Sequence, residues 1–347
     1  MLRKKTKRRN FLTYGFVILA YIILQSMVSA GSISSSLKGM LVPICAYVVM
    51  ALSLNLTVGV LGELSLGHAG FMSVGAFTGV TAAIALEQLV PSAPLRLALA
   101  LVIGALFAAI VGFLIGIPVL RLNGDYLAIV TLAFGEIIKS IFNNLYLGFD
   151  NRGLRLSLLE DRTNLNEGGR LIIAGPMGIG SIPRIASFMA GFVLILLCLA
   201  VIFHLVDSRH GRAIMAIRDN RIAAESVGLP VTHYKMMAVV TSAAMAGAAG
   251  ALFGLNYSTV VANKFDFNTS ILVLVFVVFG GLGNMFDSII AAAALTILPE
   301  ALRSFSNYRM LIYAIVLILV MLATNNATLK GLFARILPKK KEVPPHA

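Results

Sequence analysis

Charged residues are scarce in this chain, and that scarcity excludes a soluble fold. Of its 347 residues only 12% are charged and 59% are hydrophobic, and the mean hydropathy is +0.91, a composition that no soluble domain of this length shows. Cysteine is rare as well. The two cysteines, Cys45 and Cys198, both lie inside apolar runs, so neither a disulfide framework nor a metal cluster is available.

Sequence motifs of several enzyme classes are also missing. The chain has no Gly-x-x-x-x-Gly-Lys-Ser/Thr phosphate-binding loop, no His-Glu-x-x-His zinc motif and no Gly-x-Ser-x-Gly nucleophile turn. Ser65 and His68 suggest a nucleophile and a base, but no carboxylate is placed to orient them, which favours a structural role for His68. We therefore expect no catalytic residue, no bound metal and no cofactor.

Apolar runs long enough to cross a bilayer recur along the whole chain. We predict an all-α polytopic bundle that forms a single transmembrane domain over residues 1–347. Its expected spans, about ten, lie near residues 11–28, 40–60, 69–86, 97–117, 126–143, 185–205, 234–255, 270–282, 286–300 and 310–323. The first follows a basic tail at 1–10 and resembles a signal peptide, but its length favours an uncleaved span.

Lysine and arginine predict the orientation of this bundle. An even number of spans puts both termini on one side, and that side then carries the excess of basic residues. The positive-inside rule therefore places both termini, a basic tail at about 324–347 and the segment 207–230 in the cytoplasm. The net charge of +13 reflects span ends and lipid headgroups, not nucleic acid. The opposite side has a loop at about 144–184, a connector or, as its length favours, a docking surface for an extracytoplasmic protein.

Glycine marks both helix contacts and helix breaks. Rows of small residues at four-residue spacing, such as Gly104, Ala108, Gly112 and Gly116, predict closely packed helices. Two segments, Gly59–Glu63 and Gly280–Asn284, share a Gly-x-Leu-Gly-polar pattern and each separates two spans. They are either two tight turns that match by chance or the breaks of a duplicated fold near a solute pathway. The predicted topology gives the two segments the same orientation.

One long charged segment stands between spans. Asp207–Pro230 reads DSRHGRAIMAIRDNRIAAESVGLP. Gly211 can start a helix over about 212–218, Asp219 or Asn220 can cap a second over about 221–227, and Gly228 before Pro230 can end it. Ile214 and Ile217 fall on one face. The segment is either an ordinary basic loop at the membrane surface or, as its helix punctuation suggests, a docking element for a partner protein.

Polar residues inside or at the ends of spans suggest a pathway for a polar or zwitterionic solute, because each bare charge at mid-membrane costs at least about 2.5–3.5 kcal/mol. Glu136 is the foremost of them as an ionisable residue within a span, but Lys139 lies on the same helical face and pairing between the two is favoured. An ion-coupled secondary carrier that uses Glu136 is an alternative, and a membrane enzyme is a weaker one. The candidates are Asn55, Thr57, Ser65, His68, Ser73, Thr131, Glu136 and Asn256.

Four segments together carry a family resemblance: Ser53–Gly75, Asn123–Glu136, His210–Gly254 and Gly280–Asn284. The chain resembles the LivM-type permeases of bacterial branched-chain amino acid ABC transporters over most of residues 40–300. The resemblance implies that the loop at 207–230 couples to an ATPase subunit. Of the general importer motif Glu-Ala-Ala-x-x-x-Gly, Ala223, Ala224 and Gly228 are present, while Ile222 replaces the glutamate.

The resemblance implies the following assignments. The coupling residues would be Gly211, Arg212, Arg218, Arg221, Ala223, Ala224, Glu225 and Gly228. From their places in and beside the spans, and not from the resemblance, Asn55, Ser65, His68, Thr131 and Glu136 are the expected pathway residues. The partners would be a second homologous permease, two cytoplasmic ATPases that use ATP and Mg²⁺, and a periplasmic or lipid-anchored amino-acid-binding protein. The location would be the bacterial cytoplasmic (inner) membrane. Urea or short amides are an alternative substrate class, since related permeases resemble each other more than their ligands do.

Overall fold

A computed structural model describes residues 2–31, 34–87, 89–122, 124–150, 153–158 and 170–302, together with 311–312, 314–315 and 318. The chain divides into two compact units, Met1–Ala293 and Ala294–Ala347. The second unit is described only as far as the end of helix α11 and a few helical residues beyond it. Most of the predicted span at 310–323 and all of the basic tail at 324–347 lie outside the described residues. A single domain over 1–347 stays a prediction.

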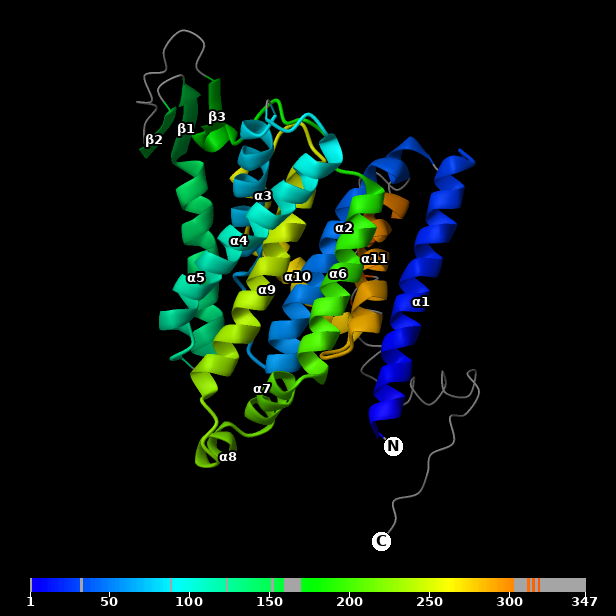
Figure 1. The fold of residues 1–347 in the computed structure, drawn as a ribbon, viewed down its shortest axis with the longest axis vertical. Coiled ribbons are helices and arrows are strands. Elements are labelled where there is room, and N and C mark those ends of the chain that lie inside the picture. Colours follow the sequence, from blue (N-terminus) through cyan, green and yellow to red (C-terminus); the bar gives the residue numbers. More distant parts are fainter. Residues whose placement is uncertain are drawn as a thin grey trace. The chain divides into compact units, whose positions relative to one another are not determined.

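Long apolar helices build the first unit (Figure 1). Helices suit an apolar surrounding because they satisfy every backbone polar group internally. The helices of the bundle are α1 (Leu2–Ser29), α2 (Ser35–Asn55), α3 (His68–Ala85), α4 (Ala93–Val119), α5 (Asp125–Asn143), α6 (Phe188–Asp207), α9 (Val231–Gly254), α10 (Phe267–Gly280) and α11 (Met285–Ala301), the last of which begins in this unit. The N-terminal run that resembles a signal peptide is part of one continuous helix; whether it is cleaved stays a prediction.

Glycine allows α3, α4 and α9 to pack tightly at the centre of the bundle. A Cβ atom at Gly75 would lie 2.0 Å from the carbonyl oxygen of Gly247, and one at Gly104 would lie 2.9 Å from the carbonyl oxygen of Gly75. A side chain cannot be accommodated at such distances, so the missing Cβ atoms let the three backbones approach. The predicted rows of small residues therefore lie where the helices meet.

Among the residues that the structure describes, seven helical segments are long and apolar enough to cross a membrane: Asn10–Ser29, Ser35–Leu61, His68–Ala85, Ala93–Val119, Phe188–Asp207, Val231–Gly254 and Ala262–Gly280. Each corresponds to one of the predicted spans. Helices α5 and α11, which correspond to the predicted spans at 126–143 and 286–300, are not among the seven. A helical membrane bundle is thus supported, whereas the number ten stays a prediction.

A small sheet corrects the expectation of an all-α fold. Strands β1 (Leu145–Asp150), β2 (Gly153–Leu158) and β3 (Arg170–Ala174) pair antiparallel in the order β2-β1-β3. They lie in the loop predicted at 144–184, whose described part is therefore partly ordered as a sheet directly after α5. A docking role for it stays a prediction.

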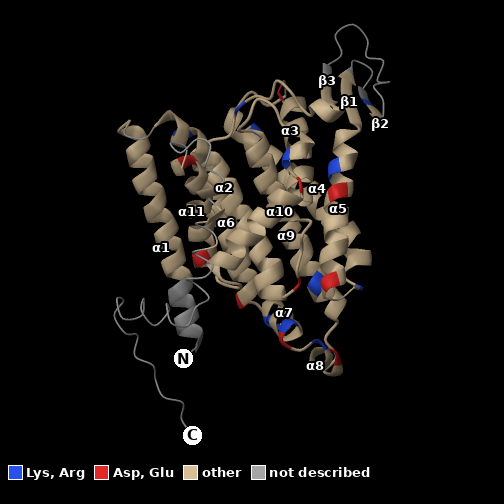
Figure 2. Cartoon of the chain, turned by 180° about the vertical axis from the view of Figure 1, so that it is seen from behind, with Lys and Arg blue, Asp and Glu red and all other residues tan. Residues whose placement is uncertain are grey.

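Two short helices, α7 (Arg209–Asp219) and α8 (Arg221–Ser226), close the opposite end of the bundle from the sheet (Figure 1). The N-terminal half of α1 lies at the same end, because Asn10 Nδ2 donates to Asp207 Oδ2 at 3.1 Å. Charged residues gather around α7 and α8 (Figure 2). The N-terminal tail and the loop thus share one end, as predicted; that this end is cytoplasmic stays a prediction.

Both predicted glycine-rich breaks interrupt helices. After α2 the backbone winds as a π-helix, η1 (Leu56–Leu61), then Gly62 adopts a left-handed φ of +83° and the chain stays non-helical until α3 begins at His68. Between α10 and α11, Gly281 and Gly283 have φ of +84° and +80°, a conformation that glycine adopts without steric cost. Short 3-10 turns, η2 (Gly175–Met177) and η3 (Ala262–Lys264), lie in the connections near the sheet. A duplicated fold stays a prediction.

Candidate functional site

The first helix of the loop begins earlier than predicted. Ser208 caps α7, since its Oγ accepts from the backbone N–H of Gly211 at 3.2 Å, and the helix starts at Arg209. Gly211 therefore does not start the helix. A Cβ atom there would lie 2.3 Å from the carbonyl oxygen of Leu205, so glycine is required for the close approach of α7 to the end of α6.

The second helix has the predicted start and stop. Asn220 caps α8 by accepting from the N–H of Ala223 at 3.0 Å. At its end Gly228 has φ of +79°, the Gly228 N–H donates to Glu225 and the Leu229 N–H donates to Ala224. This pair of bonds is a Schellman motif, which satisfies the last carbonyl groups of a helix.

One face of the loop is buried and the other is open. Ile214 and Ile217, which were predicted to share one face, are both buried, and Ile217 packs with Ala224 and Val231. Of the two predicted coupling alanines, only Ala223 is exposed, whereas Ala224 is part of this core. The residue at the position of the motif's glutamate, Ile222, is 80% exposed, and Val227 near the end of α8 is 75% exposed.

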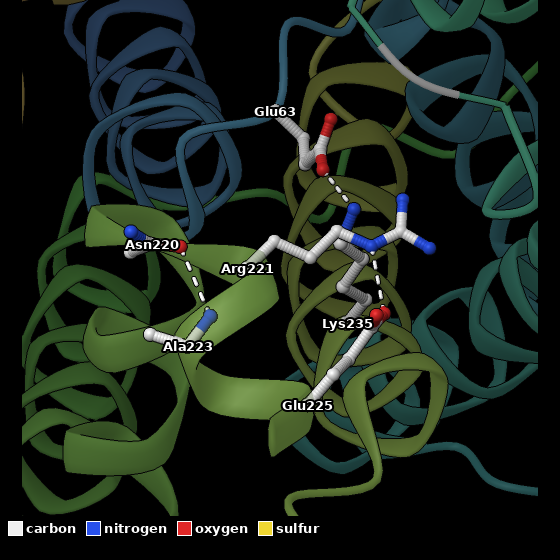
Figure 3. A network of polar contacts seen from close by, with 6 residues as sticks. All are labelled: Glu63, Asn220, Arg221, Ala223, Glu225 and Lys235. Atoms are coloured by element: carbon white, nitrogen blue, oxygen red, sulfur yellow. Dashed lines mark hydrogen bonds and ion pairs between the residues drawn. The ribbon is translucent and has the colours of Figure 1, made fainter. Parts of the chain in front are cut away.

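The arginines of the loop make different contacts. Arg212 donates to the Asp207 carbonyl oxygen at 3.3 Å. Arg221 Nε donates to Glu225 Oε1 at 2.9 Å, so these two predicted contact residues pair with each other at the surface (Figure 3). Exposed pairs of this kind contribute about 0–1 kcal/mol.

Arg218 links the loop to the break after α2. Its Nη1 donates to the carbonyl oxygen of Gly59 at 3.0 Å, while Nε and Nη2 bind Asp219 Oδ1 at 3.1 and 2.9 Å. Its methylene carbons lie against Gly62, where a Cβ atom would be 2.5 Å from Arg218 Cγ. Arg218 was predicted as a contact to a partner, and its inward bond to Gly59 was missed.

The two glycine-rich breaks contact each other through Asn55. This fully buried side chain accepts from the Gly283 N–H at 2.8 Å and donates to Ser288 Oγ at 2.8 Å and to the Asn284 carbonyl oxygen at 3.3 Å. A Cβ atom at Gly59 would lie 2.2 Å from the Gly283 nitrogen. Asn55, a predicted pathway residue, thus joins the breaks and is not among the lining residues of the cavity described next.

Four other pathway candidates, Thr57, Ser65, His68 and Thr131, line one cavity between η1, α3, α4, α5 and α9. His68 Nε2 lies 2.7 Å from Ser53 Oγ, and its buried Nδ1 has no hydrogen-bond partner among the described residues. Thr131 Oγ1 accepts from the Leu66 N–H at 3.1 Å and holds the non-helical segment against α5. The full lining is Thr57, Glu63, Ser65, His68, Phe71, Ile115, Gly116, Val119, Leu120, Leu127, Thr131, Val239 and Ser242.

Glu136 does not line this cavity. It forms an ion pair with Lys139 at 2.5 Å on the surface of α5, and the two side chains are 39% and 23% exposed. The favoured interpretation, that Lys139 neutralises Glu136, is confirmed.

A buried ion pair was missed by the sequence reasoning. Lys235 Nζ on α9 binds Glu63 Oε1 in the non-helical segment, with the lysine side chain 4% and the glutamate side chain 15% exposed (Figure 3). The only feature of the sequence that pointed to this pair was a carboxylate directly after Gly62. Within the part of the chain that the structure describes, no group of three or more His, Cys, Asp or Glu side chains could hold a metal ion.

The chain was compared with known proteins. The family model "Branched-chain amino acid transport system / permease component" matches residues 36–321. The high-affinity branched-chain amino acid transport system permease protein LivM of Salmonella typhimurium is 37% identical over 306 residues, which cover 85% of this chain and 69% of the relative. LivM of Escherichia coli matches with the same identity and coverage.

An archaeal relative matches less closely. The probable branched-chain amino acid transport permease protein LivM of Methanocaldococcus jannaschii is 27% identical over 276 residues, covering 69% of this chain and 73% of the relative. No solved structure matches the chain significantly. The family match and the identity to the bacterial permeases lead to one conclusion: the chain belongs to the family of branched-chain amino acid ABC transporter permeases.

Proposed function

We propose that this permease is the membrane subunit of an ATP-driven importer for branched-chain amino acids in a bacterial cytoplasmic membrane. The family match and the 37% identity to LivM over 85% of the chain support this assignment. The complete importer would contain a second, homologous permease, two cytoplasmic ATPases that bind ATP and Mg²⁺, and a periplasmic or lipid-anchored binding protein. The chain itself would bind no cofactor.

The observation that carries the proposal is the anchored loop at the charged end of the bundle. Its inner face is fixed by Ile214, Ile217 and the bond from Arg218 to Gly59. Its outer face presents Ile222 and Val227 to solvent. A loop that is fixed inside and apolar outside suits a partner protein that pushes or pulls on it, because apolar side chains seated in a partner's groove provide the contact area.

Movement of the loop would alter the cavity. Arg218 bonds to η1 and packs on Gly62, and the segment that follows Gly62 supplies Glu63 and Ser65 to the cavity lining. Closure of the ATPases on the loop would shift this segment against α4, α5 and α9. In the importer, that shift would open the cavity alternately to the two sides of the membrane.

Substrate identity rests on family membership more than on geometry. More distant relatives are named as a fructose import permease and as a nucleoside ABC transporter permease, at 25% and 21% identity. The binding protein would select the substrate before it reaches the permease. Branched-chain amino acids are the assignment that the bacterial LivM relatives favour.

Uptake by the complete importer tests the proposal. Right-side-out vesicles that contain the permease, its partner permease, the ATPases and the binding protein are supplied with labelled leucine. We expect uptake that requires internal ATP, survives a protonophore and is displaced by isoleucine and valine. Uptake that follows the ion gradient without ATP would indicate a secondary carrier, and displacement by urea or acetamide instead of valine would indicate the amide class.

A further inference from the structure

The buried pair of Glu63 and Lys235 is not explained by stability. Removing two charges from water is costly, and a well-packed apolar pair of similar volume often stabilises a protein equally well or better. These side chains are nevertheless only 15% and 4% exposed. Glu63 is tethered to a non-helical segment and Lys235 to the first turns of α9. The pair therefore joins two elements that the proposed mechanism moves against each other.

The pair lies at the edge of the cavity. Glu63 is one of its lining residues, and Lys235 binds Glu63 directly. Besides Glu63, the polar residues of the lining are Thr57, Ser65, His68, Thr131 and Ser242. Apolar side chains form the rest of the wall: Phe71, Ile115, Val119, Leu120, Leu127 and Val239.

From this arrangement, and on the basis of the proposed function, we infer that the ion pair of Glu63 and Lys235 opens and that the two side chains then bind the two charged groups of a zwitterion. The α-ammonium group of an amino acid binds Glu63, its α-carboxylate binds Lys235, and its aliphatic side chain contacts the apolar wall. A ligand that carries both charges can separate the pair without leaving a buried charge unpaired. A neutral solute or a ligand with one charge leaves at least one charge uncompensated, which is strongly unfavourable. His68, whose buried Nδ1 lacks a partner among the described residues, is one of the residues that line the same cavity.

The loop at 207–230 is linked to Glu63 through α7 and to Lys235 through α8. Arg218 of α7 packs on Gly62, the residue before Glu63. Helix α8 leads through Gly228 into α9, which carries Lys235 one turn from its start. A displacement of α7 relative to α8 therefore moves Glu63 relative to Lys235. In the structure described here the pair is closed and the cavity has room for only a few water molecules, so the amino acid enters when the pair opens.

Binding to the purified full chain in lipid nanodiscs tests the inference. Labelled leucine is displaced by unlabelled competitors that share its isobutyl group. Isoamylamine has only the ammonium group, isovalerate only the carboxylate, and isovaleramide neither charge. We expect saturable leucine binding, displacement by valine and isoleucine, and at least about tenfold weaker displacement by each of the three analogues. Displacement by isoamylamine or isovalerate at the same concentration as leucine would overturn the inference, as would the absence of saturable binding.

A variant that neutralises both charges distinguishes a role of the pair in ligand binding from a role in the fold alone. The double variant Glu63→Gln/Lys235→Gln removes the charges together, so no unpaired charge remains buried. The control Lys38→Gln/Glu87→Gln makes the same two changes at exposed positions. We expect the control to bind leucine like the wild type and the Glu63/Lys235 variant to bind at least about tenfold more weakly. Equal binding by both double variants would assign the pair a structural role only. If the variant does not fold, the competitor series on the wild type decides.

ATP-dependent uptake by the complete importer, measured in parallel, separates the two proposals. If the wild type shows normal uptake but the binding tests fail, the proposed zwitterion site is refuted and the proposed function still stands. Absence of ATP-dependent uptake removes the proposed function, whatever the binding tests show.

Discussion

Replacing Arg218 by methionine tests the mechanical link between the loop and the bundle. Methionine keeps an unbranched side chain against Gly62 but removes the guanidinium bonds to the Gly59 carbonyl oxygen and to Asp219. A hydrogen bond from a charged donor contributes about 1.5–3 kcal/mol when buried. Since the Arg218 side chain is 38% exposed, water screens the bond, and we expect a loss of about 1 kcal/mol.

A loss of about 1 kcal/mol leaves the fold intact and weakens the coupling, because a coupling free energy of that size corresponds to about a fivefold change. We therefore expect Arg218→Met to insert normally, to assemble with the ATPases, and to lower leucine uptake per ATP hydrolysed about fivefold. The assay measures uptake and ATP hydrolysis on the same vesicles. Arg209→Met is the matched control, since Arg209 is an exposed residue at the start of the same helix. Unchanged uptake per ATP in Arg218→Met would refute the link through Gly59.

Two further predictions concern the break and the surface ion pair. Gly59→Ala places a Cβ atom 2.0 Å from Asn55 Oδ1, so we expect a loss of about 1–3 kcal/mol in the free energy of unfolding, measured by thermal unfolding in detergent. The control Gly39→Ala, in α2 with nothing within 4 Å, should stabilise the protein by about 0.5–1 kcal/mol, because alanine favours a helix. An equal loss in both variants would contradict the close contact of the breaks. Glu136→Gln/Lys139→Gln should keep uptake within about fivefold of the wild type, because a half-exposed pair contributes about 0–1 kcal/mol. Loss of uptake together with loss of its pH dependence would instead support an ion-coupled carrier that uses Glu136.

Local signals predicted the loop well. The caps at Asn220 and Gly228 act within a few residues, so the sequence alone places the second helix nearly where the structure has it. The pairing of Glu136 with Lys139 was predictable for the same reason, since three residues along a helix bring two side chains together. The role of Gly211 was predicted wrongly, because glycine is needed there for the close contact with the end of α6 and does not start the helix.

Contacts between distant parts of the chain were not predictable. Glu63 and Lys235 are 172 residues apart, and no sequence pattern at either position identifies the other residue as its partner. The two glycine-rich breaks were recognised as similar, but their direct contact through Asn55 depends on how α2 packs beside α10 and α11. The sheet was missed although β2 alternates apolar and polar residues over Leu154–Leu158, the pattern of a half-buried strand. The many asparagine, glycine and arginine residues of the segment 144–184 favoured a loop instead.

The central claim is that the outer face of the α7–α8 loop receives an ATPase from the cytoplasmic side. Ile222→Cys tests it directly, because Ile222 is 80% exposed and both native cysteines are buried. We predict that the new thiol is protected from a membrane-impermeant maleimide in intact cells and cross-links to the ATPase subunit in membranes, with a yield that changes with nucleotide. Labelling of this thiol from outside intact cells would contradict the account.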